Sequence, residues 1–80
     1  MTGLVALTHE QGEDFAVLSV KRNVIGDPSL RQQMVAFGTQ TFGMATVLLG
    51  EDGRTWGRPD IVRSLGSIDA SHLPWRRFSV

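Results

Sequence analysis

The sequence contains no cysteine and no tyrosine, and its only lysine is Lys21. Secreted domains of this size usually depend on disulfides, so the absence of cysteine favours a reducing compartment, and we expect a cytoplasmic protein. It also excludes thiolate nucleophiles, zinc ribbons and redox-active cysteine pairs. No basic region precedes the first apolar residues, and Glu10 and Asp14 follow too soon for a secretory or transit peptide, so we expect no cleaved leader.

The sequence also lacks an excess of either charge, because eight basic residues balance eight acidic ones. A neutral chain is a poor candidate for strong, sequence-independent attraction to nucleic acid, which depends on neutralising phosphates. No apolar run approaches the roughly 18 residues that a membrane-spanning helix needs, so we expect no contact with a membrane. The two signs are unevenly placed, since residues 10–14 are mostly acidic whereas Arg76 and Arg77 lie near the end of the sequence.

Few side chains could carry catalysis or bind a metal. The only histidines, His9 and His72, are far apart in the sequence, whereas metal ligands usually recur at short spacing. Ser64, Asp69 and His72 could be combined into a triad, but no nucleophile-elbow motif supports it. The glycines around Asp52 match neither a calcium loop nor a phosphate loop. We therefore predict no catalytic residue, no metal ligand, no cofactor and no enzymatic activity.

Eighty residues support one hydrophobic core, so residues 1–80 are expected to form a single domain. Cores of this size supply little stability unless a disulfide, a metal or oligomerisation helps. The chain also has more large apolar side chains than two short helices and four strands can easily hide, and we therefore expect a homodimer. These side chains are Met34, Phe37, Phe42, Met44, Trp56, Trp75 and Phe78.

The first half of the sequence predicts two strands and a helix. Apolar runs at residues 4–7 and 15–25 flank a polar turn with a glycine, which is typical of an antiparallel hairpin. Asp27 and Pro28 then form a helix start, because a carboxylate suits the N-cap and proline suits the first helical position. We expect this helix to end at Phe42, with Gly43 as its left-handed terminator.

The second half repeats this order. Residues 44–49 form an apolar run, and the Asp-Gly pair at residues 52–53 permits a tight turn into a short strand at residues 55–56. Pro59 begins a second helix, which we expect to end near Gly66. Residues 70–80 have no helical period and are expected to form an extended C-terminal tail, or a loop that ends in a short strand.

These elements predict an α+β fold with the order strand, strand, helix, strand, strand, helix. Hairpins separated by a helix favour a mostly antiparallel four-stranded sheet with both helices on one face.

A second fold is suggested by a family resemblance. Residues 46–49, the following turn and residues 56–61 resemble the end of glutaredoxin-like domains, where a hairpin leads through Gly-x-x-Asp into the last helix. Gly57 and Asp60 supply that pattern here. The resemblance implies a degenerate thioredoxin-like arrangement as the alternative fold. The family's redox cysteine and the proline before its hairpin are both absent, so it implies no redox activity.

The most distinctive segment is the C-terminal run of Trp75, Arg76, Arg77 and Phe78. Aromatic residues interleaved with arginines are typical of protein interfaces and also of surfaces that bind single-stranded nucleic acid. A structural role competes with both, because the two aromatic side chains could fold back into the core while the arginines remain in water.

We expect this segment, with Arg63 and Trp56, to form an interaction surface. The sequence therefore predicts a non-enzymatic, homodimeric module for protein–protein interaction or regulation. Binding of single-stranded nucleic acid through the C-terminal segment is the alternative.

Overall fold

In the computed structural model, which describes residues 2–10 and 12–80, the first two apolar runs form the expected antiparallel hairpin. Strand β1 (Thr2–Glu10) pairs with β2 (Glu13–Val20) in a register that places Glu10 opposite Glu13 and Val5 opposite Leu18. The turn between them is tight, and Gly12 adopts a φ of 77°, which glycine tolerates far better than other residues. Gln11 lies outside the described residues.

The second strand is shorter than the sequence predicts, because Val24 and Ile25 belong to helix α1 (Arg22–Ile25). The polar residues that follow β2 carry the chain away from the sheet. One helical turn then brings Ile25 back to pack beneath it, where only 3% of its surface is exposed. The expectation of a strand reaching residue 25 is therefore wrong.

Helix α2 (Pro28–Phe42) begins and ends as the sequence predicts. The Asp27 carboxylate accepts hydrogen bonds from the backbone N–H groups of Ser29 and Leu30, at 2.9 and 3.2 Å, and so caps the helix. At the other end Gly43 has a φ of 70°, and its N–H donates to the Thr39 carbonyl at 3.0 Å.

The next strand corrects the prediction of a mostly antiparallel, four-stranded sheet. Strand β3 (Ala45–Gly50) lies beside β2 and runs parallel to it. Helix α2 carries the chain back along the sheet between these strands, and such a crossover connects parallel neighbours. Strand β4 (Thr55–Trp56) then pairs antiparallel with β3 as expected, after a turn in which Gly53 has a φ of 89°.

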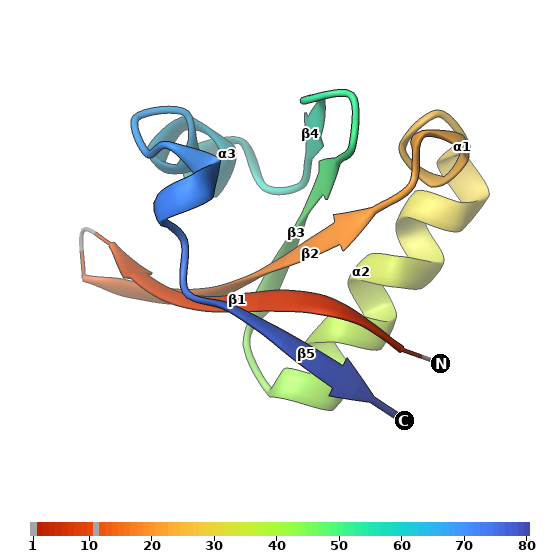
Figure 1. Cartoon of the computed structure of the whole chain (residues 1–80), viewed down its shortest axis with the longest axis horizontal. Coiled ribbons are helices and arrows are strands. Elements are labelled where there is room, and N and C mark those ends of the chain that lie inside the picture. The colour runs from red at the N-terminus through yellow and green to blue at the C-terminus, as the bar shows by residue number, and fades with distance from the viewer. Residues whose placement is uncertain (1, 11) are drawn as a thin grey trace.

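The two main helices lie on opposite faces of the sheet, not on one face as predicted (Figure 1). Helix α3 (Pro59–Leu65) packs against a core cluster that includes Phe15 and Val17, whereas α2 packs against a cluster that includes Ala16 and Leu18. Successive residues of a strand point to opposite faces, so β2 contributes to both clusters. The sheet is therefore the middle of three layers.

The C-terminal segment matches the second expectation for it, a loop that ends in a short strand. Residues Ala70–His72 form a short 3-10 helix, η1, and Trp75–Ser79 form a fifth strand, β5, antiparallel to β1. The complete sheet is mixed, with the strand order β4-β3-β2-β1-β5. Figure 1 shows that β5 ends beside the start of β1, so both ends of the chain lie at the same end of the sheet.

None of the helices in residues 2–10 and 12–80 has the length and apolar character that a membrane crossing requires.

Helix α2 approaches β3 closely where Gly38 faces Thr46. We expect the Gly38→Ala variant to lose about 1–3 kcal/mol of unfolding free energy, as overpacked cores do. The new Cβ would lie 2.5 Å from the Thr46 Cγ2 atom. This overlap outweighs the roughly 1 kcal/mol that alanine gains over glycine within a helix. Urea denaturation followed by circular dichroism measures the difference.

Gly26→Ala is the matched control. Gly26 has a helical φ of −86°, and a Cβ there would come no closer than 3.5 Å to its nearest neighbour. We expect its unfolding free energy to stay within about 0.5 kcal/mol of the parent. A Gly38→Ala variant as stable as the control would contradict the close contact between α2 and β3.

Candidate functional site

The candidate site is the outer edge of β5. This strand is last in the sheet and pairs on one side with β1, and among the described residues no strand pairs with its other side. In an antiparallel ladder, alternate residues direct their backbone N–H and C=O groups toward one neighbour or the other. Part of the β5 backbone is therefore open to hydrogen bonding from outside.

Strand geometry separates the four residues of the C-terminal motif. Trp75 packs with the cluster on the α3 face, whereas Phe78 packs with the cluster on the α2 face. Because side chains alternate, Arg77 shares the α3 face with Trp75, and Arg76 shares the α2 face with Phe78. The motif therefore does not form one surface with two aromatic rings and two arginines.

Trp75 has a structural role in holding the start of β5. Its side chain is half-buried, and its indole Nε1–H donates to the Ala70 carbonyl at 2.8 Å. Its backbone N–H donates to the Leu73 carbonyl, also at 2.8 Å. Buried indoles usually find such a partner for their N–H group. These bonds connect η1 to β5 and fix the point at which the chain enters the sheet.

Phe78 completes an aromatic cluster under the other face. Its ring centroid lies 5.8 Å from that of Phe37 and 5.5 Å from that of Phe42. Its cross-strand partner is Gly3, where a Cβ would lie only 3.0 Å from the Phe78 ring. The missing side chain of Gly3 thus makes room for the ring. Phe78 is a core residue, as the structural alternative for this segment predicted.

Arg76 and Arg77 are the exposed part of the motif. Their cross-strand neighbours on β1 are Val5 and Leu4, which cannot neutralise them. Other arginines have acidic partners: Arg54 contacts Asp52 at 2.6 Å. Within the described part of the chain, by contrast, neither Arg76 nor Arg77 forms an ion pair. The edge therefore carries two adjacent positive charges, one on each face.

Leu4 is a site residue that the sequence analysis missed. It is 42% exposed and lies opposite Arg77 on the α3 face, beyond the area that α3 covers. Together with Thr2, Gly3 and Arg77 it lines a shallow hollow of about 320 Å³. The sequence did contain a sign of this exposure. The continuous apolar run at residues 4–7 gives both faces of the strand apolar side chains, and short helices cannot cover all of them.

The other two predicted site residues lie elsewhere. Trp56 is on β4, at the opposite edge of the sheet, where its ring packs 5.2 Å from the Arg31 guanidinium. It also lines an apolar hollow of about 410 Å³ beside Val35 and Thr39 of α2. Arg63 is exposed on α3. The structure therefore does not bring Trp56 to the β5 edge, and the six predicted residues do not form one surface.

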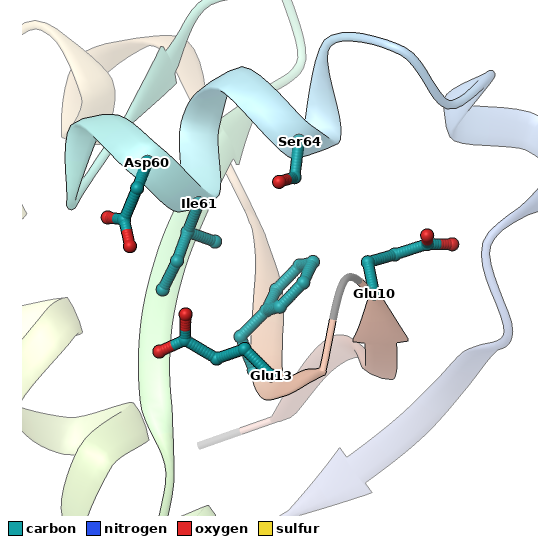
Figure 2. Close-up of a pocket in the computed structure, with 6 residues that line it drawn as sticks. Glu10, Glu13, Asp60, Ile61 and Ser64 are labelled. Atoms are coloured by element: carbon teal, nitrogen blue, oxygen red, sulfur yellow. The ribbon is translucent and has the colours of Figure 1, made fainter.

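A second concave region is acidic and lies beside α3. Figure 2 shows Asp60 and Ser64 of α3 above the strands that carry Glu10 and Glu13, around a pocket of about 200 Å³. Arg58 compensates part of the negative charge, since its Nη2 atom lies 2.8 Å from a Glu13 oxygen and 2.6 Å from an Asp60 oxygen.

The electrostatics of this pocket favour ionised groups. The hydrogen bond from Arg58 lowers the pKa of Asp60 below its ordinary value of 3.8, and the same bond raises the pKa of Arg58 above its ordinary value. A general acid at neutral pH needs the opposite shift, toward a raised carboxyl pKa. Asp60 is therefore suited to hold Arg58 in place and is poorly suited to donate a proton.

The described residues form neither the triad of Ser64, Asp69 and His72 nor a metal site. The Asp69 carboxylate accepts hydrogen bonds from the backbone and side chain of Ser71, which lower its pKa, while Ser64 lines the acidic pocket. Across residues 2–10 and 12–80, no three histidine or carboxylate side chains gather in a geometry suited to a metal. The β5 edge is thus the best candidate in the structure.

Comparisons with models of protein families, with curated proteins and with solved structures found no significant match to this chain. The hairpin of β3 and β4 followed by α3, which carries the resemblance to glutaredoxin-like domains, is present. The thioredoxin-like alternative for the whole chain gains no support from these comparisons.

The different roles of Phe78 and Arg77 can be measured. We expect Phe78→Ala to lose about 2–4 kcal/mol of unfolding free energy, because it removes the ring that joins Phe37 and Phe42. Arg77→Ala, one residue away, is expected to change the unfolding free energy by less than about 0.5 kcal/mol. Urea denaturation of both variants tests this, and equal small effects would show that Phe78 is not part of the core.

The Arg58 ion pairs predict a shift in titration. Arg58→Gln should raise the pKa of Asp60 toward 3.8, because the charged hydrogen-bond donor is lost. A carboxyl pKa lower in the folded than in the unfolded state stabilises the fold above the unfolded pKa, and that contribution is lost as the pH falls through the folded pKa. The variant should therefore lose less stability than the parent between neutral and acid pH.

Carbon-13 NMR of the carboxyl groups measures the pKa directly. Arg63→Gln is the matched control, because Arg63 is an exposed arginine of α3, close in sequence to Arg58, and has no ion pair in the described residues. An Asp60 pKa that is the same in the Arg58 variant and in the control would refute the assignment.

Proposed function

We propose that this chain is a non-enzymatic protein-interaction module, and that it binds an extended segment of a partner protein along β5. The observation that supports this most directly is the open edge of β5, which comprises five residues at the end of the sheet. An extended segment can add a strand to such an edge, where main-chain hydrogen bonds supply affinity and side chains supply specificity.

The two edge strands of the sheet differ in the length of backbone available for pairing. Strand β4 has two residues, Thr55 and Trp56, and so presents little backbone for pairing. Short edge strands are one way in which proteins prevent unwanted association. Strand β5 has five residues, and three of them, Arg76, Arg77 and Ser79, are exposed. The longer edge is therefore the better docking strand.

The homodimer was predicted from a surplus of large apolar side chains. All seven large side chains that were expected to be too many for one protomer are half-buried and pack against the two core clusters. In the described residues, Leu4, Leu7 and Val80 are the large apolar residues that remain exposed. This burial leaves the homodimer untested, and for the β5 edge we propose a partner of different sequence.

The geometry favours a protein partner over nucleic acid. Stacking of bases needs exposed aromatic rings beside the cationic groups. Here Trp75 and Phe78 are half-buried on opposite faces and make their contacts within the core. The arginines alone do not supply a stacking platform.

The charged groups of the acidic pocket support a role that is not enzymatic. The pKa of Asp60 in this pocket is lowered, and Arg58 already forms ion pairs with both Glu13 and Asp60. Neither group is poised for proton transfer at neutral pH.

Peptide titration of the isotope-labelled full chain tests this proposal. The probes are six-residue peptides with β-forming flanks and a central pair of residues that is acidic, neutral or basic. At least one should shift the amide signals of residues 75–79 and protect those amides from hydrogen exchange. Amides of the β4 edge serve as the internal control and should not change.

Absence of any effect on β5 at millimolar peptide would refute the docking edge. Light scattering over a dilution series gives a second measurement, and we expect a monomer. A concentration-dependent dimer that protects the β5 amides would replace the partner segment by a second copy of this chain.

A further inference from the structure

The charges on β5 are placed to select the segment that docks there. Arg76 and Arg77 are adjacent, so their side chains lie on opposite faces of the strand. Both are exposed, and neither has an acidic neighbour on β1, where Val5 and Leu4 face them. A strand added to the outer edge would therefore meet one uncompensated positive charge on each of its faces.

The geometry of paired strands indicates which residues a docking segment needs in order to pair with these charges. Side chains directly opposite each other in an antiparallel pair have Cβ atoms about 4.5–5.5 Å apart, close enough for an ion pair. Two consecutive acidic residues on the incoming segment would point to opposite faces and could each meet one arginine. A single acidic residue would satisfy one arginine and leave the other unpaired.

The same charges disfavour a second copy of this chain. Antiparallel pairing of β5 with itself over all five residues would place Arg77 opposite the Arg77 of the other copy. Like charges directly opposite each other destabilise a strand pair, so this longest register is penalised.

From these observations we propose that β5 binds an extended segment with two consecutive acidic residues, in preference to a second copy of this chain. The inference rests on the proposed function, because it assumes that β5 is the docking edge. It adds the class of partner and names Arg76 and Arg77 as the residues that determine specificity.

The experiment compares three acetylated and amidated peptides that share the flanks Thr-Val and Val-Thr. Their central pairs are Glu-Glu, Gln-Gln and Lys-Lys. We expect the Glu-Glu peptide to bind about 2- to 30-fold more tightly than the Gln-Gln peptide, as two favourable cross-strand ion pairs imply. The Lys-Lys peptide should bind more weakly than both. The advantage of the acidic peptide should shrink as salt is raised, because exposed charges are screened.

A double variant tests the assignment to the arginines. Arg76→Glu with Arg77→Glu should reverse the preference and favour the Lys-Lys peptide. Arg76→Gln with Arg77→Gln is the second variant, and it should bind the three peptides equally. The amide spectrum of each variant confirms that the sheet is intact, and Arg63→Gln is the control that should keep the preference for the acidic peptide.

The outcomes separate this inference from the proposed function. If the Glu-Glu and Gln-Gln peptides bind β5 equally, the docking edge stands and the charge selection is refuted. If no peptide perturbs residues 75–79, the proposed function fails as well. Binding of an eight-residue oligothymidylate through the arginines, tighter than any peptide and with a steep loss on adding salt, would refute a protein partner in favour of nucleic acid.

Discussion

The structure depends on the central strand β2 being buried on both faces. Phe15 and Val17 point to one face, Ala16 and Leu18 to the other, and each is at most 1% exposed. A strand with two apolar faces needs a cover on each side, because burial of apolar area is the main favourable term in folding. Helices α2 and α3 supply those covers, and the three-layer arrangement follows (Figure 1).

The same alternation governs the end of the chain. Strand β5 extends the sheet beyond β1, so its side chains are divided between the two layers in turn. Trp75 and Phe78 are three positions apart and therefore enter different layers, where each completes a core cluster. What remains for the surface is the pair of arginines and an open backbone edge. A segment with the composition of a binding motif thus divides into structural and exposed residues.

A small domain with an open edge must control what pairs with it. Uncontrolled edges lead to aggregation, and charged side chains on the edge are a common protection. The arginines of β5 meet this requirement, since they oppose pairing with another β5. The same charges would attract an acidic strand, so protection from self-association and selection of a partner can come from one pair of side chains.

The local elements that are bounded by strong chemical signals could be predicted from the sequence alone. Asp27, Pro28 and Gly43 set the bounds of α2, and Pro59 set the start of α3, because capping and proline geometry act within a few residues. The equal numbers of acidic and basic residues and the lack of cysteine were also evident from the sequence.

Three features could not be predicted in this way: the face that each helix covers, the parallel pairing of β3 with β2, and the pairing of residues 75–79 with β1. Each depends on contacts between residues distant in sequence. The pattern of β2 allowed a helix on either face, and nothing local to Trp75 or Phe78 distinguished an exposed ring from a buried one. Leu4 shows the same limit, because its exposure depends on how far α3, more than fifty residues later in the chain, extends over the sheet.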